Sequence, residues 1–161
     1  MDVKEFNQSV DLYSDAIYRF VVKNLKDSEK ARDVVQDCFE KLWKRHTEVN
    51  YQKVKSYLFT SAYHTLIDQI RRDKKLASMD QVDVQAMSYE TGYSDLNELL
   101  HKAVSQLPES QRMVVMMRDY EGYSYQEISE ITGLSEAQVK VYIFRARVYL
   151  KNYIGQIESV I

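Results

Sequence analysis

The stretch that decides the fold is residues 124–139, which read SYQEISEITGLSEAQV. Ser124 with Glu127 fits a capping box, in which a hydroxyl and a longer side chain three residues on satisfy each other's backbone N–H groups. Ser135 with Gln138 fits a second one, eleven residues later. Gly133 lies between them, where a left-handed residue ends a helix without a Cβ clash. Two short helices joined by a glycine-containing turn form a helix-turn-helix, which commonly places its second helix in the major groove of DNA.

The second helix of this unit has one apolar side and one mixed side. Its predicted buried stripe consists of Val139, Ile143, Ala146 and Leu150. The candidate DNA-contacting residues on the remaining surface are Ala137, Lys140, Val141, Phe144, Arg145 and Arg147. Cations of this kind reach guanine edges or phosphates, and apolar groups contact thymine methyls. Arg147 is expected to contact phosphate or to lie on a solvated flank. The competing interpretation is a helical pair whose basic residues only face water.

Length and composition limit what else the chain can be. It has 161 residues, one cysteine, four glycines and one proline, which favours one ordinary domain or two small ones built from helices. A single cysteine excludes an intrachain disulfide and fits a reducing cytoplasm. No run approaches the roughly 20 apolar residues of a membrane span, and the first residues lack a signal-peptide pattern, so we expect a cytoplasmic protein without membrane insertion. The net charge of −2 predicts weak DNA binding alone and recruitment by something larger.

Apolar spacing predicts an all-α fold of two small helical domains joined by a flexible linker. One helix is expected at 5–25 and another from about Ser56 to Lys75. Between them, a helix is expected to begin at Ser28 as its N-cap, with an apolar stripe that includes Val35. Residues 76–95 hold four acids and no lysine or arginine, and they lose the periodicity. A helix from Asp95, a helix opened by Pro108 at its first position, and the helix-turn-helix follow. The predicted domains are therefore 1–75 and 96–161, with a linker at 76–95.

Two further surfaces are candidates for binding. The helix after residue 55 mixes aromatic, basic and amide side chains, which suits single-stranded DNA: Tyr57, Phe59, Tyr63, His64, Gln69, Arg71 and Arg72. Aromatic residues at helical spacing are also the ordinary content of a core. The second helix has an acidic and amide face that is either solvated or docks on a basic partner: Asp33, Gln36, Asp37, Glu40 and Lys41.

Catalysis and cofactors find little support in the sequence. His46, His64 and His101 have no metal-ligand spacing, and no glycine-rich phosphate loop is present. Cys38 falls on an apolar helical stripe, which is typical of a buried small hydrophobe. We therefore predict neither an enzyme nor a cofactor or metal site.

Several segments together resemble the extracytoplasmic-function (ECF) class of the bacterial sigma-70 family. The C-terminal half does so through 107–112, 121–128, 133–135 and 139–147, which are similar to the promoter-binding domain of that class. Residues 33–43 resemble its helix for core RNA polymerase, and 57–60 with 66–72 resemble its promoter-melting helix. The chain departs from the class at Tyr63-His64, where Arg-Asn is common, and at Val141, where a small polar residue is common.

The resemblance implies a role for each surface. The acidic face of the second helix would contact core RNA polymerase, whose clamp helices and flap are the implied partners. The 46–55 loop with Asn50, and the helix after it, would hold an unstacked base of the −10 element as single-stranded DNA. The second helix of the helix-turn-helix would read the −35 element as duplex. An anti-sigma factor is a further implied partner.

Two other classes of protein stay open on the sequence alone. A stand-alone helix-turn-helix regulator would bind duplex DNA as a dimer without polymerase. A nuclease using Asp33 and Asp37 with a metal would show metal-dependent cleavage.

Overall fold

The computed structural model describes residues 1–80 and 95–158, and every regular element in those two ranges is a helix. The chain divides into two compact units, Met1–Met87 and Ser88–Ile161. The predicted all-α fold with two helical domains is therefore confirmed.

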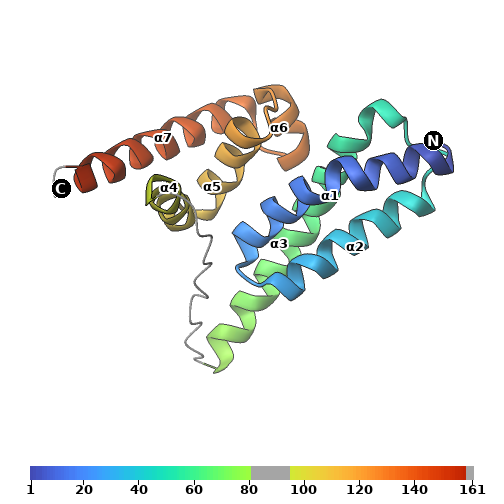
Figure 1. The fold of residues 1–161 in the computed structure, drawn as a ribbon. Coiled ribbons are helices and arrows are strands. Elements are labelled where there is room, and N and C mark those ends of the chain that lie inside the picture. Colours follow the sequence, from blue (N-terminus) through green and yellow to red (C-terminus); the bar gives the residue numbers. More distant parts are fainter. Residues whose placement is uncertain (81–94, 159–161) are drawn as a thin grey trace. The chain divides into compact units, whose positions relative to one another are not determined.

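The first unit is a three-helix bundle of α1 (Val3–Leu25), α2 (Ser28–Lys44) and α3 (Val54–Asp80), in which each helix packs against the other two (Figure 1). A short 3₁₀ turn, η1 (Tyr51–Lys53), leads into α3. The largest fully buried side chains are Ile17, Phe20, Leu42, Leu58, Phe59 and Leu66. The rings of Phe20 and Phe59 meet edge to face, with centroids 5.6 Å apart, which joins α1 to α3 at the centre of this core.

The start of α2 differs from the prediction by one residue. The N-cap is Asp27, whose carboxylate accepts from the backbone N–H groups of Glu29 and Lys30, both at 3.1 Å. Ser28 is the first helical residue instead of the cap. The buried stripe of α2 also contains Val34, whereas Val35 is only half-buried.

The third helix is longer than its periodicity predicts. It begins at Val54 instead of Ser56 and runs to Asp80, five residues beyond Lys75. The predicted linker is thus wrong for 76–80, which are helical, and for Asp95, which begins α4. Residues 81–94 lie outside the described ranges. The helix α3 extends beyond its last core contact because adding residues to a formed helix is easier than nucleating a new one.

The second unit contains α4 (Asp95–Gln106), α5 (Glu109–Val115), a π-helical turn η2 (Met116–Tyr120), α6 (Tyr125–Thr132) and α7 (Glu136–Glu158). Pro108 is the N-cap of α5 and not its first helical residue. The helix α7 packs on α4, α5 and α6, and its Ala146 is buried with Leu107 and Val115. The second helix of the helix-turn-helix is therefore the start of α7, a long helix that also packs against the core of this unit.

Candidate nucleic-acid interface

The two predicted capping boxes are both present. Glu127 donates its backbone N–H to Ser124 Oγ at 3.1 Å, and Ser124 N–H donates to Glu127 Oε1 at 3.0 Å. The same pair of contacts joins Gln138 and Ser135, at 3.1 and 3.0 Å. Gly133 ends α6 with φ +79°, the left-handed conformation that glycine adopts without strain. The helix-turn-helix predicted from the sequence is confirmed in its caps and its turn.

Side chains of α6 fix the turn between the two helices. Ser129 Oγ donates to the carbonyl oxygen of Leu134 at 2.6 Å, and Leu134 N–H donates to Thr132 Oγ1 at 3.2 Å. These two bonds satisfy backbone groups that would otherwise be orphaned at a helix end. The angle at which α7 leaves the turn is therefore set by short-range hydrogen bonds within the unit.

The outer surface of α7 is separated cleanly from its buried stripe. Val139, Ile143 and Ala146 are buried, with Leu150 half-buried, as predicted. We call the exposed residues on the other side the recognition face: Ala137, Lys140, Val141, Phe144 and Arg145. Phe144 is 69% exposed. A phenylalanine that exposed contributes little to the core, so the ring is available for contact with a partner.

Arg147 does not belong to the recognition face. Its guanidinium pairs with the carboxylate of Asp119 in η2, with Nε 3.3 Å from Oδ2 and Nη2 2.5 Å from Oδ1. Asp119 also raises the pKa of Arg147 through this hydrogen bond. The prediction that Arg147 contacts phosphate or lies on a solvated flank stays a prediction: the residue is exposed, and its ion pair with Asp119 also joins α7 to η2.

Two residues near Arg147 were missed by the sequence analysis. Tyr125, the first residue of α6, has the guanidinium carbon of Arg118 over its ring at 4.7 Å from the centroid. The Nζ of Lys140 lies over the same ring at 5.5 Å. Only the fold brings these residues together, because they come from η2, α6 and α7, and no sequence spacing indicates the cluster.

The acidic face of α2 lies on the surface of the first unit. Four of its members are exposed and Asp37 is half-buried: Asp33, Gln36, Asp37, Glu40 and Lys41. Asp37 Oδ2 pairs with Lys41 Nζ at 3.0 Å and raises the pKa of that lysine. Gln36 Nε2 lies 3.5 Å from Glu40 Oε1. The face is continuous and carries more negative than positive charge.

The aromatic and basic residues predicted on α3 fall into two groups. Six are accessible: His64, Arg71 and Arg72 are exposed, and Tyr57, Tyr63 and Gln69 are half-buried. Phe59 is fully buried against Phe20, so its proposed contact with DNA is corrected to a core position. Asn50 is exposed and caps η1, where its side-chain oxygen accepts from Gln52 N–H at 3.1 Å.

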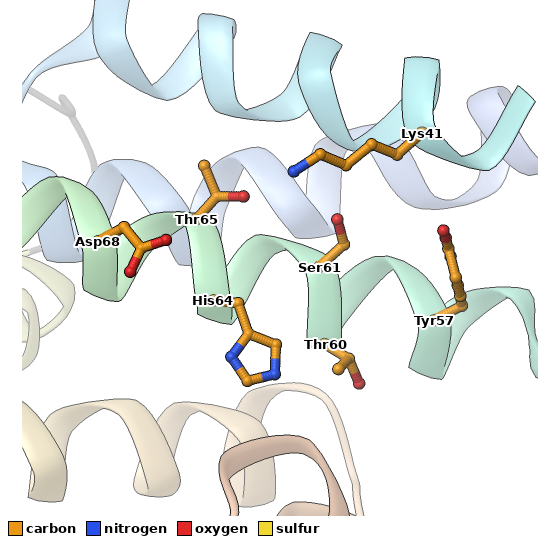
Figure 2. A pocket seen from close by; sticks show the side chains of 7 residues that line it. All are labelled: Lys41, Tyr57, Thr60, Ser61, His64, Thr65 and Asp68. Atoms are coloured by element: carbon orange, nitrogen blue, oxygen red, sulfur yellow. The ribbon is translucent and has the colours of Figure 1, made fainter. Parts of the chain in front are cut away.

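A hollow between α2 and α3 connects the two candidate surfaces of the first unit (Figure 2). It has a volume of about 280 Å³ and is lined by Lys41, Tyr57, Thr60, Ser61, His64, Thr65 and Asp68. A second hollow of about 360 Å³ shares two of these residues and is lined by Lys41, Lys44, Arg45 and Tyr57. Cations beside an aromatic ring are the arrangement that single-stranded nucleic acid uses for phosphate and base.

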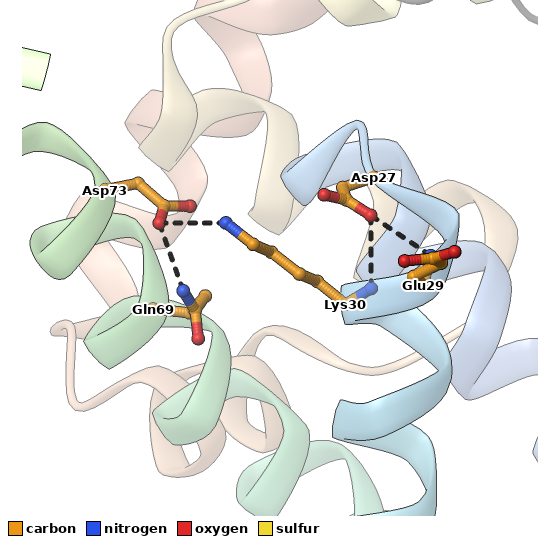
Figure 3. Close-up of polar contacts among 5 residues, drawn as sticks. All are labelled: Asp27, Glu29, Lys30, Gln69 and Asp73. Atoms are coloured by element: carbon orange, nitrogen blue, oxygen red, sulfur yellow. Dashed lines mark hydrogen bonds and ion pairs between the residues drawn. The ribbon is translucent and has the colours of Figure 1, made fainter. Parts of the chain in front are cut away.

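The side-chain amide of Gln69 has a defined orientation. Its Nε2 donates to Asp73 Oδ1 at 3.1 Å, and Lys30 Nζ lies 3.2 Å from the same oxygen (Figure 3). A carboxylate attracts the NH₂ group and repels the amide oxygen. The Gln69 oxygen is therefore the end of the amide turned away from Asp73.

Cys38 is buried, and burial raises the pKa of its thiol to about 11. We expect iodoacetamide to leave the folded chain unmodified at pH 8 and to modify it after denaturation, because the reactive species is the thiolate. Mass spectrometry of both samples measures this; rapid labelling of the folded chain would contradict it.

The raised pKa also makes the stability of the fold depend on pH, because the folded state holds the proton of the Cys38 thiol more tightly than the unfolded state does. The stabilisation from this proton is complete below pH 9 and is lost as pH rises through about 11.

Neither a metal-binding cluster nor a membrane-spanning helix is present among the described residues. No group of three or more His, Cys, Asp or Glu side chains in 1–80 and 95–158 is arranged to hold a metal ion. No helix within those ranges has the length and apolar character needed to cross a membrane.

Comparison with known proteins covers both units. The family model described as Sigma-70 region 2 matches residues 10–76, and that described as Sigma-70, region 4 matches residues 97–150. Over 148 residues the chain is 30% identical to the ECF RNA polymerase sigma factor SigM of Bacillus subtilis (strain 168), covering 87% of this chain and 89% of the relative. RNA polymerase sigma factor SigV of the same organism is 32% identical over 132 residues, covering 80% and 78%.

A solved structure is similar along almost the whole chain. It is the sigma factor RpoE in complex with the anti-sigma factor NepR from Bartonella quintana, with a TM-score of 0.81 and 26% sequence identity. The alignment covers 95% of this chain and 98% of that one.

Proposed function

This chain belongs to the ECF class of the sigma-70 family of RNA polymerase sigma factors. We propose which of its surfaces binds polymerase, which holds opened DNA and which reads duplex DNA. The chain directs RNA polymerase to promoters and is not a stand-alone regulator, because the family likeness extends over both units.

The recognition face of α7 reads the −35 element in the major groove. The observation that carries this assignment is the exposure of Lys140, Val141, Phe144 and Arg145 on one side of a helix whose other side is buried. Arg145 and Lys140 donate to guanine edges or phosphates, while Phe144 and Val141 contact thymine methyl groups. Arg147 acts indirectly, because its pair with Asp119 holds α7 in place.

The accessible residues of α3 and the loop before it hold the −10 element after the strands separate. Tyr57, Tyr63 and His64 offer rings for stacking, and Arg71 and Arg72 offer charge to the backbone. Asn50 presents its side chain at the start of η1, and the Gln69 oxygen accepts from a base. Stacking contributes roughly 1–3 kcal/mol per base, which offsets part of the cost of unpairing.

The acidic face of α2 docks on core RNA polymerase, at its clamp helices, while the second unit lies at its flap. A surface with excess carboxylates fits a basic partner, and complementary charge raises the rate and specificity of association. Polymerase then supplies affinity that a chain of net charge −2 lacks on its own. The likeness to a structure that contains an anti-sigma factor supports the proposal that a protein inhibitor binds this chain and covers these surfaces. The chain acts in the cytoplasm, where RNA polymerase works.

Transcription with purified core enzyme tests the proposal. The chain and core RNA polymerase are incubated with a duplex pool randomised at both promoter elements, and the transcribed templates are sequenced. Enrichment of defined −35 and −10 sequences, dependent on both proteins, is the expected result. Absence of any promoter-specific RNA from the pool would overturn the proposal.

Single substitutions on α7 should then separate base reading from phosphate binding. Replacing Arg145 with alanine should relax the preference at one −35 position, at a cost of roughly 1–3 kcal/mol for a side chain that reads a base edge. The same selection repeated with the variant measures this. Glu130→Ala on the exposed side of α6 is the control, because it removes a charged side chain outside the recognition face. An unchanged −35 preference in the Arg145→Ala variant would remove that residue from the proposed site.

A further inference from the structure

The ring of Tyr125 lies where three elements of the second unit meet. The residue is half-buried at the start of α6. Arg118 of η2 and Lys140 of α7 each place a cation over the ring, at 4.7 and 5.5 Å from its centroid. Both distances fall within the range of about 6 Å in which a cation is attracted to the electron-rich face of an aromatic ring.

Both cations are linked to the rest of the unit. Arg118 Nη1 donates to the carbonyl oxygen of Tyr123 at 2.8 Å, which anchors that side chain independently of the ring. Tyr125 also contributes, after Asp119, to the raised pKa of Arg147, whose guanidinium forms the ion pair with Asp119. The ring is thereby held from η2 and α7, and Lys140 is the member of the cluster that belongs to the recognition face.

An exposed lysine ordinarily samples many rotamers, and ordering it on binding costs conformational entropy. A ring that attracts its ammonium group before DNA arrives removes part of that cost, which is the general effect of preorganisation on affinity. The ring also offsets part of the mutual repulsion of Arg118 and Lys140, because both cations are attracted to its π electrons.

We propose that Tyr125 is a positioning residue for the −35 contact and that its ring holds Lys140 in the orientation used to bind DNA. This inference rests on the proposed function, in which Lys140 contacts the −35 duplex. It assigns Tyr125 an effect on promoter binding that is electrostatic, depends on Lys140, and leaves the fold of the second unit unchanged.

Stepwise fluorination of the ring tests the inference, since fluorine withdraws electron density from the ring with little change of shape. Phenylalanine and its mono-, di- and trifluoro derivatives are placed at position 125 of the full chain, which is bound to core RNA polymerase. Affinity for the promoter selected from the randomised pool is measured for each. We expect affinity to fall in steps, by about 2–5-fold across the series, as for an exposed cation–π contact.

The same series with Lys140→Met provides the decisive comparison. The dependence on fluorination should vanish there, and Tyr125→Phe alone reports the loss of the hydroxyl. A flat series with Lys140 present, or an equal slope with Lys140→Met, would overturn the inference. Thermal unfolding of each variant shows that the fold is unchanged, and a double-mutant cycle of Tyr125→Leu with Lys140→Met gives the same coupling by a second route.

The failures of the two proposals are distinguishable. If Lys140→Met leaves promoter affinity unchanged, the assignment of Lys140 to −35 DNA fails, and the inference falls with it. If Lys140→Met weakens binding but the fluorination series is flat, only the role of Tyr125 is wrong.

Discussion

Replacing Asp33 and Asp37 with lysine is expected to weaken binding of the chain to core RNA polymerase by at least about 100-fold, equivalent to about 2.7 kcal/mol. Both side chains lie on the acidic face of α2, and the substitutions turn attraction into like-charge contact across the interface, which costs several kcal/mol. The fold should survive, because the ion pair that the change removes, between Asp37 and Lys41, lies on the surface of α2. An exposed helix pair of this spacing contributes only about 0.3–0.5 kcal/mol.

A matched variant carries the same change of charge elsewhere in the same unit. Asp11 and Asp15 are exposed on α1, also four residues apart, and their replacement by lysine should leave polymerase binding within about threefold of the original. Affinity is measured by titration of labelled chain with core enzyme at physiological salt. Equal loss in both variants would mean that net charge, and not the acidic face, determines binding.

Replacing Phe59 with alanine should destabilise the first unit by about 3–5 kcal/mol, whereas the same change at Phe144 should alter stability by less than about 0.5 kcal/mol. Phe59 is fully buried against Phe20, so its removal leaves a cavity in the core. Phe144 is 69% exposed and supports no core contact. The Phe144→Ala variant should instead lose promoter affinity by at least about fivefold, or about 1 kcal/mol.

Chemical denaturation and promoter binding, measured on both variants, check this pair of predictions. Because 3–5 kcal/mol is a large part of the stability of a small domain, Phe59→Ala should shift the unfolding midpoint of the first unit strongly. Phe59→Leu refills most of the volume and should recover most of the loss. A stable Phe59→Ala chain that binds polymerase but fails to open promoters would restore Phe59 to the −10 surface.

Local features of the fold could be predicted from the sequence because their causes lie within a few residues. The capping boxes at Ser124 and Ser135 and the left-handed Gly133 depend on contacts three or four residues apart. The buried stripe of α7 follows from helical periodicity. Errors occurred at element ends, such as the Asp27 cap and the extension of α3 to Asp80, where several neighbouring residues satisfy the same local rule.

The candidate site was less predictable, because composition does not say which side of a helix is covered. Phe59 and Phe144 are the same residue type, and each lies on a helix, yet Phe59 is buried in the core and Phe144 is exposed. The partner of Arg147 lies 28 residues away, and that of Lys30 lies 43 residues away. Such pairings depend on how the helices pack, and no spacing in the sequence indicates them.

The sequence by itself determined the helices, the helix-turn-helix and the family, because caps, periodicity and motifs act over short range. Only the tertiary structure decided which aromatic and charged side chains remain available to DNA and polymerase. It buried Phe59, joined Arg147 to Asp119, oriented Gln69 through Asp73 and brought Arg118 and Lys140 to the ring of Tyr125. The physical reason is that burial and long-range ion pairs depend on the packing of helices distant in sequence, whereas helix formation depends mainly on neighbouring residues.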